Sequence, residues 1–300
     1  MIGSFRLAPR PDRRAIIDPG FLGTRDRAAL RILNRADVAT TAQLVTLVYR
    51  RRQTAQERLA SLYRAGWIER AVLPPATRGG APLAFRLSLR TRRRLGYLPL
   101  TRNRAGIALR HSLNTVETVV ALVRIDPGLG NPDPVRAWLT ERIASDASLR
   151  GVYPDSVVAV SLPSGSGVLC LEIDNATEHA PVIRDKLVRY APALRERPAW
   201  SVLFVVESAA RATALARIGR ELAGAASLEG RAGVVVLPDL ATGGAAAPVL
   251  PMAPGGGRTT LAGFLRDAQA RTGATPVGSD AWIEALAHGG FVDAMETLGW

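Results

Sequence analysis

Three acidic side chains near the middle of the chain have the spacing of a metal-binding cluster. Glu172 and Asp174 lie two residues apart at the end of an apolar run, so in a strand they share one face. Asp155 opens a second apolar run, and a turn centred near residues 164 and 165 would place it beside Asp174 and diagonally from Glu172. Three neighbouring carboxylates repel one another unless a cation or a proton offsets their charge. Oxygen ligands of this kind suit Mg²⁺ or Mn²⁺.

A lysine and a tyrosine follow this cluster on a predicted helix, residues 181–194. Lys186 and Tyr190 are four residues apart and therefore face the same way. Lys186 is the only lysine, and the other 38 of the 39 Lys and Arg residues are arginine. Lysine acts as a point charge and can lose its proton, whereas arginine does not readily do so. Either this position needs an ammonium group, or one lysine persists by chance in an arginine-rich composition.

Two motifs around these residues resemble known families. The order Pro154-Asp155, then Glu172-Ile173-Asp174, then a lysine resembles the PD-(D/E)XK nuclease motif. More narrowly, the segments LEIDNATE at 171–178 and KLVRY at 186–190 resemble the replication-relaxation protein family, over roughly residues 25–238. The nuclease motif has its lysine two residues after the acidic residue, where this chain has Asp174, so Lys186 would have to take that place.

This resemblance implies a protein of plasmid replication or mobilisation that joins a winged-helix DNA-binding domain to a restriction-endonuclease-like fold. Asp155, Glu172 and Asp174 would hold Mg²⁺ or Mn²⁺, which would activate the nucleophile of a DNA nicking or cleaving reaction. Glu117 is a fourth ligand candidate, and Glu141 competes with it. Lys186 would add positive charge, and Tyr190 is the nearest candidate for a tyrosine nucleophile of the relaxase kind.

A second function remains open from the sequence. The chain would then be a non-catalytic, sequence-specific DNA-binding accessory factor or transcriptional regulator with a vestigial nuclease fold. The acidic cluster would in that case be a hydrated strand end, with Asp174 in a capping role.

Apolar periodicity in the first third of the chain predicts three helices and a hairpin. A winged helix-turn-helix has this order. The predicted helices are residues 25–36, 41–49 and 53–64, and the strands are residues 67–70 and 83–89.

Positive and amide side chains surround the third of these helices. Arg50, Arg51 and Arg52 precede it and would meet DNA phosphates. The outward side of the helix would read bases in the major groove, and the hairpin tip would add a further contact. The residues concerned are Gln53, Gln56 and Arg58 on the helix and Arg78 at the tip.

Alternating strands and helices in the second part of the chain predict a mixed α/β sheet, so the fold class is α+β. The expected strands are residues 135–143, 155–162, 168–174, 200–206 and 232–237, and the helices are residues 106–124, 181–194 and 209–225. The predicted organisation is a basic flexible arm (1–23), a winged helix-turn-helix domain (24–105), a nuclease-like domain (106–238), and a linker with a helical tail (239–300). Gly, Ala and Pro dominate residues 241–258, which favours the linker.

Charge is distributed unevenly along the chain. Residues 1–110 contain 23 arginines and 6 acidic residues, whereas the remainder has 16 basic and 20 acidic residues. The asymmetry favours double-stranded DNA as the partner of the first part. A single cysteine, Cys170, excludes an internal disulfide and a cysteine-based zinc site. No membrane-length apolar run and no signal-like start occur, so we expect a cytoplasmic protein, with a homodimer through the tail left open.

Overall fold

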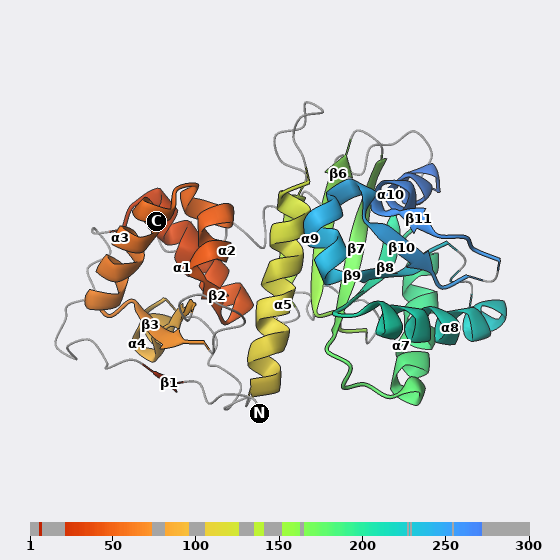
Figure 1. Ribbon diagram of the computed structural model, residues 1–300, viewed down its shortest axis with the longest axis horizontal. Helices are drawn as coiled ribbons and strands as arrows, with labels where there is room; N and C mark the ends of the chain where they lie inside the picture. The colour runs from red at the N-terminus through yellow and green to blue at the C-terminus, as the bar shows by residue number, and fades with distance from the viewer. Residues whose placement is uncertain are drawn as a thin grey trace. The chain divides into compact units, whose positions relative to one another are not determined.

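The fold is that of a computed structural model of the chain (Figure 1). It describes residues 6–7, 22–73, 82–95, 106–125, 135–140, 152–162, 165–226, 228, 230–253 and 255–271. The chain is mixed α and β and divides into two units, residues 1–116 and 117–300. None of the helices in the described ranges has both the length and the apolar character needed to cross a membrane.

Three helices form the core of the first unit. They are α1 (Thr24–Ala36), α2 (Thr41–Leu44), which continues as a π-helical segment (Val45–Tyr49), and α3 (Arg52–Arg64). Thr40 begins α2 with a capping box, because its hydroxyl accepts from the Gln43 N–H at 3.2 Å and its own N–H donates to the Gln43 side chain at 2.9 Å. Helix α3 buries Ala55, Leu59 and Leu62, which are four and three residues apart and so lie on one face of the helix.

A small antiparallel sheet completes this unit. Its strand order is β1-β3-β4-β2, with β1 (Arg6–Leu7), β2 (Ala39–Thr40), β3 (Ile68–Val72) and β4 (Leu83–Leu87). The predicted hairpin corresponds to β3 and β4, which pair from Ile68↔Leu87 to Val72↔Leu83. The segment predicted as a flexible arm contributes β1 to the edge of the sheet. A short helix, α4 (Leu89–Arg94), replaces the predicted end of the second strand.

A seven-stranded mixed sheet forms the centre of the second unit. Its order is β11-β10-β9-β8-β7-β6-β5. Strands β5, β6 and β7 are antiparallel neighbours, β7, β8 and β9 run parallel, and β10 and β11 are antiparallel again. The strands are β5 (Val135–Thr140), β6 (Ser156–Leu162), β7 (Gly165–Asp174), β8 (Trp200–Val206), β9 (Ala232–Val236), β10 (Pro248–Pro251) and β11 (Thr259–Thr260).

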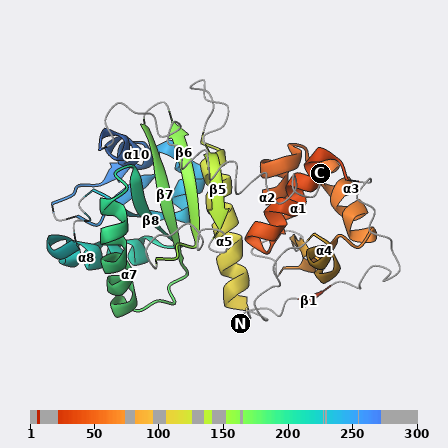
Figure 2. The ribbon, with the colours of Figure 1, turned by 180° about the vertical axis from the view of Figure 1, so that it is seen from behind.

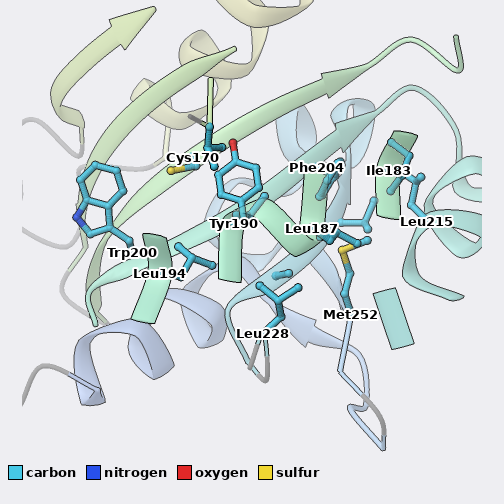
Figure 3. Close-up of a cluster of buried hydrophobic side chains, with 14 of the residues drawn as sticks. Cys170, Ile183, Leu187, Tyr190, Leu194, Trp200, Phe204, Leu215, Leu228 and Met252 are labelled. Carbon is cyan, nitrogen blue, oxygen red and sulfur yellow. The ribbon is translucent and has the colours of Figure 1, made fainter. Parts of the chain in front are cut away.

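Helices cover both faces of this sheet (Figures 1 and 2). Helices α7 (Ala180–Arg195) and α8 (Ala209–Ala226) pack side by side over the main apolar core, and α10 (Leu261–Ala270) packs on β7 from the other face. At Gly165, a Cβ atom would lie only 2.6 Å from the backbone of Arg266 in α10, so this close approach requires glycine. Figure 3 shows the core on the other face, where Leu187 and Tyr190 of α7 lie among strand side chains.

The remaining helices of the described residues are α5 (Gly106–Val123), α9 (Leu237–Gly243) and a short 3₁₀ helix (Gly244–Ala246). Strand β8 is the middle strand of the seven and β7 is its neighbour, and both are buried along their whole length. The strand predicted for residues 200–206 is therefore confirmed, and its wholly apolar sequence suits a strand that is covered on both faces.

Two expectations about the second unit are wrong. Residues 241–258 are not a linker, because β10 pairs with β9 from Val249↔Val235 to Pro251↔Gly233 and extends the sheet. The hairpin register also differs, since Ser156 pairs with Leu171 and Leu162 pairs with Gly165. Continued by one residue, this register places Asp155 opposite Glu172 and not opposite Asp174. The shift is two residues, so each side chain keeps its predicted face.

Candidate functional site

The β6–β7 hairpin brings Asp155 and Glu172 together. Asp155 directly precedes β6 in the chain. Its Oδ2 atom accepts a hydrogen bond from the backbone N–H of Ile173 at 2.7 Å. Glu172 and Asp174 both project from β7 toward the helices α7 and α8, as their alternation in the sequence predicts. The carboxylates predicted to converge are therefore neighbours, and their contacts distinguish the role of each.

Glu172 is a buried carboxylate with two donors. Its side chain is 3 % exposed, Lys186 donates to Oε2 at 2.8 Å, and Tyr190 donates to Oε1 at 2.6 Å. Burial and the negative charge of Asp155 raise the pKa of Glu172 from 4.5 to about 7, although Lys186 and Tyr190 act in the opposite direction. Glu172 therefore changes its charge near neutral pH.

Lys186 bridges two glutamates. Its Nζ atom lies 2.8 Å from Glu172 Oε2 and 2.7 Å from Glu178 Oε1. Burial lowers the pKa of Lys186, but the two glutamates raise it by more, so its net pKa lies above the ordinary value. The ammonium group consequently stays charged at neutral pH. Glu178 belongs to the segment between β7 and α7, and its part in this cluster was not predicted.

Tyr190 lies in the apolar core between α7 and the sheet (Figure 3). Only 1 % of its surface is exposed. Burial, and then the charge of Glu172, raise the pKa of its hydroxyl well above 10, so the group keeps its proton and donates it to Glu172. A tyrosine in this position supports a buried carboxylate and is not open to a large substrate.

Asp174 has a cation of its own. Arg211 of α8 donates through Nε to Asp174 Oδ2 at 2.6 Å, and the backbone N–H of Ala176 donates to Oδ1 at 2.7 Å. Arg211 also donates to the carbonyl of Glu178 at 2.6 Å. Asp174 thus fixes the turn after β7 and joins it to α8. The alternative interpretation of the sequence assigned a capping role to Asp174, and its hydrogen bond to the turn agrees with that role. Its pairing with Arg211 could not be predicted, because Arg211 lies 37 residues further along the chain.

These contacts leave the expected metal site without a suitable donor set. Both oxygens of Glu172 and both oxygens of Asp174 already accept hydrogen bonds from protein groups. In the part of the chain that is described, no group of three or more His, Cys, Asp or Glu side chains is arranged to hold a metal ion. Glu117 is half-buried on α5, and Glu141 lies outside the described residues. The residues present therefore fit a network of ion pairs better than a Mg²⁺ or Mn²⁺ site.

The side chains predicted to bind DNA surround the start of α3. The five residues at or near this start are exposed, namely Arg50, Arg51, Arg52, Gln53 and Gln56. Gln53 donates to Glu57 at 3.0 Å on the helix surface. Arg58 differs, because its guanidinium forms an ion pair with the buried Asp26 of α1, to which Tyr49 also donates. Arg58 therefore joins α3 to α1, and Arg78 lies outside the described residues.

A family model described as replication-relaxation matches residues 30–203, more than half of the chain. The match includes α3, the β6–β7 hairpin, α7 and most of β8. No curated protein and no solved structure matches the chain.

Proposed function

Because the chain belongs to the replication-relaxation family, we propose that it acts in plasmid replication or mobilisation as a protein that binds double-stranded DNA. The single observation that carries this proposal is the exposed run Arg50, Arg51 and Arg52 directly before and at the start of α3. Three adjacent guanidinium groups at the start of a helix suit contacts with phosphates, which supply most of the affinity for DNA.

In this proposal the first unit is a winged helix with α3 as its recognition helix. The support is the order of α1, α2, α3 and the β3–β4 hairpin, which is that of a winged helix-turn-helix. Gln53 and Gln56 are exposed on α3, and their amides have the donor and acceptor needed to recognise adenine in the major groove. Arg90, Arg93 and Arg94 on α4 are also exposed and would extend the positive surface.

Binding to a labelled duplex, measured by fluorescence anisotropy over a range of salt concentrations, tests this function. The affinity should fall steeply as salt rises, because each neutralised phosphate releases bound cations. An affinity that is insensitive to salt, or no binding at low salt, would contradict it.

We further propose that the second unit has a nuclease-like fold without nuclease activity. The order of β5, β6, β7, α7, β8, α8 and β9, preceded by α5 across the boundary of the two units, is the order expected of the endonuclease-like resemblance. Catalysis is disfavoured because Glu172 and Asp174 are already paired with Lys186 and Arg211, and because Tyr190 is buried.

A nicking assay on supercoiled plasmid tests this second proposal. The wild type and Asp155→Ala would each be incubated with Mg²⁺ or Mn²⁺, and neither should nick the plasmid faster than the buffer does. Cleavage by the wild type that disappears in Asp155→Ala would establish a nuclease in place of the vestigial fold.

A further inference from the structure

The ammonium group of Lys186 is surrounded by carboxylate oxygens, as a bound metal cation would be. It lies 2.8 Å from one glutamate and 2.7 Å from another, and the two carboxylates come from different segments, Glu172 on β7 and Glu178 on the turn that precedes α7. A third carboxylate, Asp155, is close enough for its negative charge to raise the pKa of Glu172. We propose that the ammonium group of Lys186 is the resident cation of this site and takes the place between Glu172 and Glu178 that a divalent metal ion would otherwise fill.

The burial of Glu172 explains why a cation is needed. A carboxylate that is 3 % exposed loses most of its hydration and becomes costly unless it is paired and hydrogen-bonded. Tyr190 supplies a hydrogen bond without charge, so Lys186 is the positive partner that contacts Glu172 directly. The neighbouring Asp174 does not share this ammonium group, because Arg211 neutralises it separately.

The geometry also explains why this position is a lysine. An ammonium group is a compact charge with three donors, so it can contact two carboxylates that approach from different directions. A guanidinium group is planar and favours two parallel bonds to one carboxylate. Of the 39 Lys and Arg residues in this chain, the one exception to arginine is the residue that bridges Glu172 and Glu178.

This inference rests on the proposal that the second unit is not a metal-dependent nuclease, but it does not require DNA binding. The wild-type site should bind no Mg²⁺ or Mn²⁺. Because Lys186 lowers the pKa of Glu172, its removal favours the protonated acid, and the metal titrations of the variants are therefore made at pH 8 or above. Under these conditions the site should present two carboxylates without a cation, which oxygen-preferring divalent cations can occupy. Duplex binding measured in parallel keeps the two proposals separate, because the Lys186 variants should bind duplex DNA like the wild type.

A single lysine makes the wild-type experiment direct. In tag-free protein labelled with ¹⁵N-lysine, the side-chain nitrogen signal arises from Lys186 alone. At pH 8, above the pKa of Glu172, titration with Mn²⁺ should leave this resonance sharp, because no paramagnetic ion comes near it. Broadening that saturates with Mn²⁺ and disappears in Glu172→Gln would place a metal ion in the site and overturn the proposal.

The variant Lys186→Met supplies the complementary result, since it keeps a side chain of similar length without the charge. Electron paramagnetic resonance should detect saturable Mn²⁺ binding to this variant, and the added substitution Glu172→Gln should abolish the binding. Lys186→Met that folds but binds no Mn²⁺ would contradict the proposal. If the variant is unfolded without metal, recovery of its circular dichroism signal with Mn²⁺ would support the proposal, and failure to recover would count against it.

Discussion

The hydroxyl group of Tyr190 lies 2.6 Å from Oε1 of Glu172, at the border between the apolar core and the ion pairs at the end of β7. The tyrosine ring belongs to the core between α7 and the sheet, whereas its oxygen serves a carboxylate. Packing of α7 and charge balance at Glu172 are therefore coupled through one side chain. Substitutions of Tyr190 or Glu172 should therefore change the stability of the protein, which substitution of a purely catalytic group would not be expected to do.

Tyr190→Phe should destabilise the protein although it removes only one oxygen atom. The buried Glu172 loses a donor that it cannot replace with water, which costs about 1–3 kcal/mol in the free energy of unfolding. Urea denaturation followed by circular dichroism measures the difference. Tyr153→Phe is the matched control, because Tyr153 is 58 % exposed and its substitution should change stability by less than about 0.5 kcal/mol. Equal effects of the two substitutions would contradict the role given to the Tyr190 hydroxyl.

The raised pKa of Glu172 predicts a pH dependence of stability. The folded protein holds a proton on Glu172 between pH 4.5 and about 7, whereas the unfolded chain releases it. The contribution of this group to the free energy of unfolding should therefore be largest below about pH 4.5 and should decline as the pH rises to about 7. The decline is at most about 3 kcal/mol, since each unit of pKa corresponds to about 1.4 kcal/mol.

Denaturation of the wild type and of Glu172→Gln across this pH range isolates the effect. The difference between their unfolding free energies should change over the window from pH 4.5 to about 7 and should be flat above it. Glu221→Gln serves as the control, because Glu221 forms an exposed ion pair with Arg184 and its variant should follow the wild-type curve. A wild-type curve parallel to that of Glu172→Gln would refute the shifted pKa.

The pair of Arg211 and Asp174 should behave as a buried ion pair. Arg211→Met leaves the Asp174 side chain, which is 2 % exposed, without its cation, and this should cost about 3–5 kcal/mol. Combining it with Asp174→Asn removes the stranded charge, so the double variant should be more stable than the sum of the single effects predicts. Arg217→Met on the exposed face of α8 is the control and should have little effect. Simple additivity of the two substitutions would show that the pair is not coupled.

The strands and the face of the carboxylates were predictable because they depend on local patterns. The apolar run of residues 200–206 coincides with β8, and alternation placed Glu172 and Asp174 on one face. The hairpin register was not predictable, since the Pro-Ser-Gly-Ser-Gly segment offers several turn positions and the sheet selects one of them. Strand β10 was missed because it is only four residues long and has proline at both ends, which strand interiors disfavour but strand ends tolerate.

The partners of the charged residues were beyond the reach of sequence patterns. Arg58 occupies an outward position in the predicted helix, yet its partner Asp26 lies 32 residues earlier in the chain. Arg92 belongs to an arginine run that resembles a solvated surface, yet its side chain is buried and bonded to Asn34 and Asp37. Such pairings are set by how α1, α3 and α4 pack, so a count of arginines overestimates the positive surface.

The DNA-binding proposal makes a quantitative prediction for Arg51 and Arg52, both exposed at the start of α3. Replacing both with alanine should weaken binding to every duplex, because phosphate contacts carry no sequence information. The slope of log affinity against log salt should decrease by about one for each phosphate that is no longer neutralised, or ~2 for the double variant. Anisotropy titrations at several salt concentrations measure both the affinity and the slope.

Arg195→Ala, at an exposed arginine that ends α7, is the matched control for this double variant and should leave the slope unchanged. The control removes one positive charge from the second unit without touching α3, so it separates a local contact from the overall charge of the protein. If the double variant kept the wild-type slope, or if Arg195→Ala lowered it equally, the positive charge of the chain would act diffusely, and α3 would not be the element that contacts DNA.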